Sequence, residues 1–354
     1  MEFLAEYGSF LLKVVTLVVA VLILVGGIVS IAARNKKSSD GELVIKKVNE
    51  ELEDNKDQLE YAVSSEGELK ALEKQRKKED KEKEKKEKKL AKTAPDPAVA
   101  RKKRVYVIDF DGDIRASDVE LMRKEITAIL TLAEKNDEVV VRLESGGGMV
   151  HSYGFGASQL KRIRDRGIHL TVCVDMVAAS GGYMMACLAD RIVAAPFAII
   201  GSIGVVAQLP NFSKVLKKYD VDYELFTAGE YKRTVTMFGE NTDKAKEKFQ
   251  ADLEETHDLF KHHVKHHRPR VDIEAVATGD IWYGVQAIDH KLIDEVGTSD
   301  DYLVAACDNA DVYTVRYEFK KTLQEKLGFA VQVGFERAVT RVLTSLQNQM
   351  QSKG

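Results

Sequence analysis

The apolar positions of the chain begin with one long uninterrupted run near the N-terminus. Residues 14–33 read VVTLVVAVLILVGGIVSIAA and carry no charge. A helix of this length matches a hydrocarbon core about 30 Å thick. Glu2 and Glu6 lie in residues 1–13, where a signal peptide has a basic segment, and the run is longer than a signal peptide's apolar part. The pattern therefore predicts a retained transmembrane helix over 14–33 in a lipid bilayer.

Residues 34–102 are strongly charged and show no pattern of a globular core. Arg34, Lys36 and Lys37 follow the predicted span, so the positive-inside rule favours the cytoplasm for the rest of the chain, although long domains can cross a membrane despite their charge. Residues 73–89 are charged at all but one position, which is typical of a solvated helix or disordered spacer, with attraction to anionic lipid as the alternative. A heptad-like seam ahead of this run permits a short coiled coil or amphipathic helix: Ile45, Val48, Leu52 and Leu59.

Residues 103–313 alternate short apolar runs with amphipathic ones. The apolar runs predict strands over 105–110, 138–143, 169–174 and 192–195. The amphipathic runs predict helices over 117–134, 153–166 and 181–189. Short apolar strands that alternate with helices indicate a buried parallel sheet, so we predict an α/β domain. Apolar residues at helical spacing predict an amphipathic helical extension over 314–354, which a partner, a membrane surface or the domain could cover.

Composition excludes several classes of protein. Lys and Arg number 53 and Asp and Glu 56, giving a net charge of -3. This balance argues against nucleic acid as a partner, because phosphate neutralisation needs a concentrated basic face. Three cysteines in apolar surroundings are too few for a disulfide framework and are predicted to be core residues: Cys173, Cys187 and Cys307.

A histidine-rich stretch lies at 257–267. Its i, i+4 histidine pairs have a spacing that can bind a metal ion. No acidic ligand or glutamate base accompanies them in the pattern of a zinc peptidase. We therefore predict a solvated surface helix, and no metal site.

Three glycine-rich turns follow predicted strands, at 145–148, 180–182 and 201–204. Parallel strands deliver such turns to one edge of the sheet, where α/β proteins hold their sites. A run of glycines frees backbone N–H groups to face an anion, either a phosphate or the oxyanion of an acyl transfer. Two glycine-rich motifs bind phosphate after a strand, G-x-x-x-x-G-K-[ST] and G-x-G-x-x-G, and neither occurs at these turns. The oxyanion interpretation is therefore favoured.

Ser180 lies directly before a predicted short helix, where the helix dipole favours negative charge. It is a candidate nucleophile, with a simple N-cap as the alternative. Downstream, no histidine has a strand-end or turn context that suggests a base for this serine. Lysine is the base in serine–lysine variants of the catalytic triad. Lys232 is the candidate, after a predicted strand over 223–227.

With these residues the chain resembles the protease IV / signal peptide peptidase A family of serine peptidases, which have the ClpP/crotonase-like fold. The resemblance spans about residues 105–296. It rests on five segments: 142–148, 179–183, 201–205, 229–232 and 279–284. Lys232 follows Ser180 by 52 residues and Ser202 follows it by 22, as in single-length members of the family.

The resemblance implies a role for each candidate residue. Ser180 is the expected nucleophile, Lys232 the general base, and Ser202 the hydroxyl that orients the lysine amine. The backbone N–H groups of Gly147 and Gly181 are the expected oxyanion donors. No cofactor and no metal are implied.

Two features of the candidate site need explanation. The chain reads Glu-Ser-Gly-Gly-Gly over 144–148, where the family commonly has Asn-Ser-Pro-Gly-Gly, so the turn is less restrained. A lysine in water has a pKa near about 10.4 and must be desolvated to act as a base. We therefore expect an apolar environment for Lys232, with Glu230 pointing away from it.

These observations predict a membrane-anchored serine endopeptidase that acts through an acyl-enzyme. The resemblance implies signal-peptide remnants or other membrane-associated or unfolded polypeptides as substrates. It also implies a bacterial inner-membrane location and a ring of identical subunits, an octamer for a single-length chain. A crotonase-type acyl-CoA enzyme and a catalytically silent membrane scaffold are the alternatives.

Overall fold

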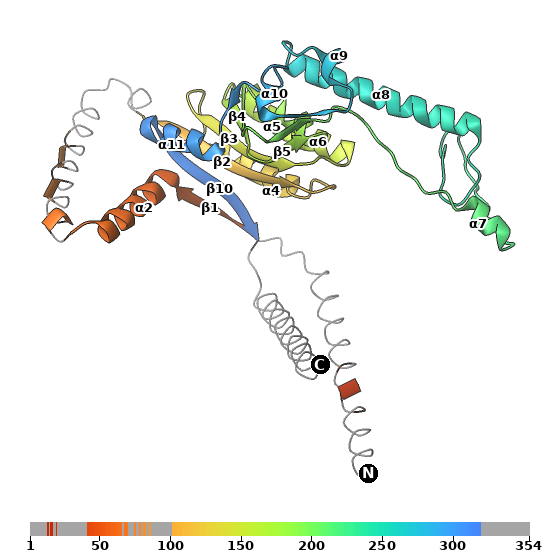
Figure 1. Ribbon diagram of the computed structural model, residues 1–354, viewed down its shortest axis with the longest axis horizontal. Helices are drawn as coiled ribbons and strands as arrows, with labels where there is room; N and C mark the ends of the chain where they lie inside the picture. Colours follow the sequence, from red (N-terminus) through yellow and green to blue (C-terminus); the bar gives the residue numbers. More distant parts are fainter. Residues whose placement is uncertain are drawn as a thin grey trace, which may run out of the picture. The chain divides into compact units, whose positions relative to one another are not determined.

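The computed structural model describes residues 41–65 and 101–319, with a few single residues and short stretches between 13 and 85 (Figure 1). The chain divides into two compact units, residues 43–317 and residues 1–42 with 318–354. The fold below is that of the first unit. Most of the predicted span over 14–33, and the chain beyond Phe319, lie outside the described residues. Within the part of the chain that is described, no helix combines the length and apolar character needed to cross a membrane.

A sheet of mainly parallel strands forms the centre of the unit, which confirms the α/β class. Its order is β1-β10-β2-β3-β4-β6-β9. The bounds are β1 Gly41–Lys47, β2 Lys103–Gly112, β3 Glu138–Ser145, β4 His169–Val174, β6 Arg191–Ala194, β9 Glu295–Val296 and β10 Ala310–Phe319. The central strands are rich in valine, and Val139, Val140 and Val141 of β3 are all fully buried. Burial on both faces explains why these strands read as continuous apolar runs.

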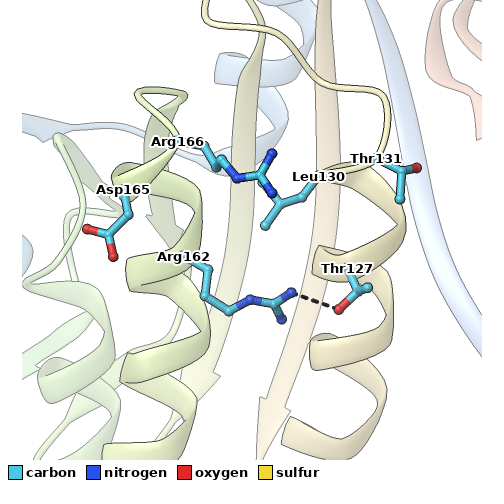
Figure 2. A pocket seen from close by; sticks show the side chains of 6 residues that line it. All are labelled: Thr127, Leu130, Thr131, Arg162, Asp165 and Arg166. Carbon is cyan, nitrogen blue, oxygen red and sulfur yellow. Dashed lines mark hydrogen bonds between the residues drawn. The ribbon is translucent and has the colours of Figure 1, made fainter.

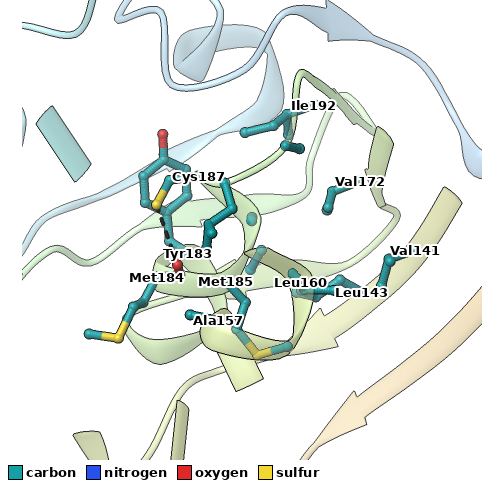
Figure 3. Packing of buried hydrophobic residues seen from close by; sticks show 14 of the residues in the cluster. Val141, Leu143, Ala157, Leu160, Val172, Tyr183, Met184, Met185, Cys187 and Ile192 are labelled. Carbon is teal, nitrogen blue, oxygen red and sulfur yellow. Dashed lines mark hydrogen bonds between the residues drawn. The ribbon is translucent and has the colours of Figure 1, made fainter. Parts of the chain in front are cut away.

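Helices cover both faces of this sheet. The helices α4 (Val119–Ile129), α5 (Val150–Asp165) and α6 (Gly181–Ala186) pack on one face within the larger core cluster. Figure 3 shows side chains of β3, α5 and α6 meeting in that cluster. Leu303 of α11 (Ser299–Asn309) belongs instead to a second cluster with Val105 and Val140. The predicted strands and helices of 105–195 are thus present, with small shifts at their ends.

Three short strands form a branch at one edge of the sheet. Strand β5 (Val177–Ala179) pairs with β3 and with β7 (Ile199–Gly201) in parallel. Strand β8 (Ile281–Tyr283) pairs antiparallel with β7. Each of β3, β5 and β7 ends in one of the three glycine-rich turns. The branch therefore brings the three turns to one place.

Residues 204–242, here called the arm, lead from β7 to the long helix α8 (Asp243–His267). The arm contains one short helix, α7 (Ser213–Lys218), and most of its residues are exposed. The strand predicted over 223–227 is wrong, because these residues are exposed and pair with no other strand that the structure describes. Two short helices follow α8, α9 (Ile273–Val276) and α10 (Gly284–Ala287).

The part of the charged segment nearest the sheet contains a helix where the heptad-like seam permitted one, but also a strand and contacts with the sheet that the sequence did not predict. Strand β1 lies beside β10, and helix α2 (Val48–Val63) follows it. Asn49 joins α2 to the end of the unit, since its Nδ2 donates to the carbonyls of Cys307 and Ala310 at 3.1 and 3.0 Å. Its Oδ1 accepts from the backbone N–H of Val312 at 2.8 Å. Strand β10 also continues to Phe319, beyond the predicted start of the helical extension at 314.

Glu125 of α4 gives the unit a pH-dependent stability. Its side chain is 4% exposed, Oε1 accepts from the backbone N–H of Tyr317 at 2.7 Å, and Oε2 is buried without a hydrogen-bond partner. Burial raises its pKa to about 7. The unfolded chain ionises this group at lower pH, so stability is lost as the pH rises from about 4.5 to 7.

We predict that Glu125→Gln raises the free energy of unfolding by about 1–2 kcal/mol at pH 8 and changes it much less at pH 5. Urea unfolding at the two pH values measures this difference. Glu120→Gln, on an exposed position of the same helix, serves as the control. An equal change at both pH values contradicts the prediction.

Candidate active site

Ser180 occupies the junction between β5 and α6 in an unusual backbone conformation. Its φ of 53° and ψ of -118° lie in a region that residues with a side chain rarely adopt, at a cost of about 1–3 kcal/mol. The backbone is held on both sides, because its N–H donates to Gly201 O at 2.8 Å and its carbonyl accepts from Met184 N at 2.9 Å. The side chain makes no capping hydrogen bond to α6. The N-cap alternative therefore does not explain Ser180.

The first glycine turn lies directly against this serine. Gly147 has a φ of +90°, and a Cβ there would lie 2.7 Å from both Gly181 N and Ser180 Cβ. A Cβ on Gly182 would lie 2.5 Å from Ser145 O. Only glycine permits these approaches. The structure therefore brings together Ser180, Gly147 and Gly181, as the sequence predicted.

The amides of this turn have different partners. The N–H of Gly147 donates to Ser145 Oγ at 3.0 Å, so in this conformation it is not free to bind a ligand. The N–H of Met149 donates to Ile114 O at 2.9 Å. Between them, Gly148 is exposed, and its amide has no acceptor among the residues that the structure describes. Gly148 is thus an available donor that the sequence analysis did not select.

Ser202 lies beside Ser180. Ala179 and Gly201 are partners in the β5–β7 register, so Ser180 and Ser202 are the next pair along the two strands. Ser202 has a φ of 50°, and its N–H donates to Asp280 O at 2.7 Å. The segment that contains Asp280, which the sequence analysis singled out, therefore supports the Ser202 turn.

Lys232 is exposed and lies on the arm. Its neighbour Glu230 forms an ion pair with Lys244, at 2.9 Å, near the start of α8. The ring of Tyr231 lies 5.6 Å from the Lys248 amine, also in the first part of that helix. Glu230 thus pairs with Lys244 and not with Lys232, as expected. The exposed turn around Lys232 does not, however, give the lysine the apolar environment that was expected.

The later part of α8 contacts the segments that carry the two serines. His257 Nε2 lies 3.2 Å from Ile203 O, and His263 Nε2 lies 3.0 Å from Met184 O. From Lys248 to His263 the helix advances 15 residues, roughly 22 Å at about 1.5 Å per residue. Figure 1 shows the same arrangement, with α7 and α6 toward opposite ends of α8. Within one chain, the structure does not bring Lys232 to Ser180.

These contacts also correct the prediction of a solvated histidine helix. His257 and His263 are half-buried and bind backbone carbonyls, and burial lowers the pKa of His263. The i, i+4 pattern gave no signal for them, because their partners lie more than 50 residues away in the chain. Among the residues described, no group of three histidine, cysteine or acidic side chains is placed to hold a metal ion.

A cavity of about 570 Å³ lies elsewhere, between α4 and α5 (Figure 2). It is lined by Thr127, Leu130, Thr131, Arg162, Asp165 and Arg166. Arg162 donates to Thr127 Oγ1 across it at 3.0 Å. Helix α5 starts next to the glycine turn and reaches the cavity about 12 residues later, at Arg162, roughly 18 Å away. The cavity is therefore separate from Ser180.

Comparison with known proteins identifies the family of the chain. Residues 2–160 match the model of the family described as "Peptidase family S49 N-terminal", and residues 162–313 match "Peptidase family S49". The chain belongs to peptidase family S49. This membership confirms the family resemblance predicted from the glycine turns.

Several relatives are named Probable protease SohB, and three of them are described here. The protein of Haemophilus influenzae is 53% identical over 92% of this chain and 92% of its own length. That of Buchnera aphidicola subsp. Schlechtendalia chinensis is 47% identical over 86% of this chain and 100% of its own length. The protein of Buchnera aphidicola subsp. Acyrthosiphon pisum is 54% identical over 65% of this chain and 68% of its own length. The S49 chain is therefore a SohB-like protease.

The histidines near the end of α8 give the S49 chain a measurable acid sensitivity. Burial, followed by the neighbouring His263 and His266, lowers the pKa of His267 to about 4. The folded protein therefore holds this ring neutral where the unfolded chain protonates it, so stability is lost as the pH falls from about 6.5 to 4.

We predict that His267→Asn makes the free energy of unfolding depend less on pH between 6.5 and 4. Urea unfolding at half-unit pH steps measures the slope. His151→Asn, at an exposed position of α5, is the matched control. An unchanged slope in His267→Asn shows that this ring does not contribute.

Proposed function

We propose that this protease is a membrane-anchored serine endopeptidase whose nucleophile is Ser180. The observation that carries the proposal is the strained Ser180 backbone, held at the edge of the sheet with the glycine turn against it. Such strain persists only where the surrounding structure enforces it, and it clusters at active sites. The β3–β5–β7 branch with its three turns supports the ClpP/crotonase-like fold that the sequence resemblance implies.

The reaction follows the acyl-enzyme route. The Ser180 hydroxyl attacks the carbonyl carbon of the scissile peptide bond, and its proton passes through the lysine base to the leaving amine. Water then hydrolyses the ester and restores the serine. Backbone N–H groups stabilise the oxyanion in both steps. In the conformation described, Gly181 and Gly148 are the available donors, while Gly147 holds the turn through its bond to Ser145.

Lys232 remains the proposed base, supplied by the arm of a second copy of the chain. The arm of the same chain lies along the first part of α8, away from Ser180. The lysine that serves each Ser180 would therefore come from a neighbouring subunit. The arm exposes large apolar side chains, which are typical of an interaction surface: Val206, Leu209, Phe212, Val215, Tyr223 and Phe226. Packing of this surface in a ring also supplies the desolvation that a lysine base needs.

The substrates proposed are signal-peptide remnants and other membrane-associated or unfolded polypeptides. The apolar run over 14–33 supports this proposal, because an anchored peptidase meets such chains at the inner membrane. Placement of the domain on the cytoplasmic side rests on the basic residues after that run. Ring assembly, an octamer by the family resemblance, restricts entry to extended chains.

We predict that a fluorophosphonate probe labels the assembled wild-type protein at Ser180. Ser180→Ala abolishes labelling, and Lys232→Ala lowers its rate at least about 100-fold, because general-base catalysis contributes about 10²–10⁴. Gel fluorescence and peptide mass mapping measure the result. Lys246→Ala, which removes another exposed lysine near the start of α8, is the control and keeps near wild-type labelling. Absence of labelling in the intact wild-type assembly favours the scaffold alternative.

Subunit mixing tests the origin of the base. Coexpressed Ser180→Ala and Lys232→Ala chains form rings in which some neighbours combine an intact serine with an intact lysine. For a one-to-one random mixture we expect about one quarter of the wild-type peptidase rate, since half the chains keep Ser180 and half of their neighbours keep Lys232. Each variant expressed alone is the control. No recovered activity contradicts a dyad shared between subunits.

A further inference from the structure

Two buried hydroxyl groups hold the glycine turn beside Ser180. Ser145 is 2% exposed, and its Oγ accepts the Gly147 N–H at 3.0 Å. The same oxygen lies 2.5 Å from Tyr153 OH, to which it donates its one hydrogen, and 3.1 Å from Gly112 O. Tyr153, fully buried in α5, donates its hydroxyl hydrogen to Asp113 O at 2.7 Å. The backbone amide of the turn is therefore connected to a helix in the core.

Apart from this network, the only backbone hydrogen bond described for the turn joins the Met149 N–H at its far end to Ile114 O. Glycine at 146, 147 and 148 leaves no side chain to restrict the dihedral angles. The peptide plane between Gly146 and Gly147 is oriented by the bond from Gly147 N to Ser145 Oγ. The next peptide plane, which carries the N–H of Gly148, is related to the first by the dihedral angles of Gly147, whose φ is +90°.

We propose that Ser145 and Tyr153 are positioning residues of the oxyanion hole. Ser145 Oγ holds the Gly147 N–H, so that the following amide, that of Gly148, faces the oxyanion together with the amide of Gly181. Tyr153 OH accepts the hydrogen of the Ser145 hydroxyl and so fixes the direction of that hydroxyl. This inference rests on the proposed serine peptidase function and explains how a turn of three glycines keeps a catalytic geometry.

The size of the effect follows from oxyanion-hole chemistry. Removing one donor lowers kcat by about 10²–10³. A donor that is still present but points in the wrong direction loses only part of this effect on kcat. We therefore expect Ser145→Ala to lower kcat about 10- to 100-fold. Tyr153→Phe leaves the bond from Gly147 to Ser145 in place and lowers kcat about threefold to tenfold.

The experiment measures cleavage of a fluorogenic peptide and inhibition by the matching peptide aldehyde, with the full-length assembled protein. We expect KM to change less than about twofold, while the aldehyde Ki rises by the same factor as kcat/KM falls, because the aldehyde adduct uses the oxyanion hole. The double variant is expected to be no slower than Ser145→Ala alone, since both residues act through one amide.

Two control variants lose buried or half-buried hydroxyls that form no hydrogen bond with the turn. Ser299→Ala removes a hydroxyl that bonds Asp175, and Tyr302→Phe removes one that bonds Glu138. Both are expected to keep wild-type kcat. A further control measures Kd of the substrate peptide in a Ser180→Ala background, where adding Ser145→Ala is expected to leave binding unchanged.

Three outcomes overturn the inference. If wild type cleaves the peptide and Ser145→Ala keeps kcat within about twofold, the hydroxyl does not position the turn, and the proposed function stands. If Ser145→Ala weakens substrate binding and kcat together with thermal stability, its role is structural only. If the wild-type assembly neither cleaves peptides nor reacts with the fluorophosphonate, the proposed function fails and this inference fails with it.

Discussion

The site depends on one constraint, the backbone conformation of Ser180. A residue with a side chain adopts a φ of 53° and a ψ of -118° only if its neighbours leave no alternative. Here the strand before it is paired on both edges, and every residue of α6 after it is buried. Tyr183 and Met185 are fully buried, so α6 cannot relax without opening the core. Packing of the core thus maintains the strain and presents the serine at the edge of the sheet.

The glycines around Ser180 follow from the same constraint. The turn after β3 approaches the start of α6 so closely that a Cβ on Gly147 or Gly182 has no room. This approach brings backbone amides close to Ser180, the proposed nucleophile, which is the arrangement that an acyl transfer requires. The price is a turn without side chains, whose orientation depends on hydrogen bonds from the buried hydroxyls of Ser145 and Tyr153.

Helix α8 separates the two halves of the proposed dyad. Its later part is tied to the serine segments by His257 and His263, and its first part carries the contacts of the arm. About 22 Å of helix, from Lys248 to His263, therefore separates the contacts of the arm from the serine segments of the same chain. The exposed apolar side chains of the arm are understandable if a neighbouring subunit covers them. Activity would then depend on assembly, because an isolated chain lacks a base beside its serine.

Sequence alone was sufficient for the α/β class, the strands and helices between 105 and 195, and the convergence of the Ser180, Gly147 and Ser202 turns. These features depend on local patterns, namely valine-rich runs and glycines at strand ends, and parallel strands carry such ends to one edge. Tertiary structure alone decided that the Gly147 amide is occupied, that His257 and His263 bind carbonyls, and that Asn49 joins the charged segment to the sheet. It also decided that Lys232 lies far from Ser180 in its own chain. The physical reason is that these contacts depend on the orientation of side chains and on the length of helix α8. A periodic pattern of apolar and polar residues contains no information about either.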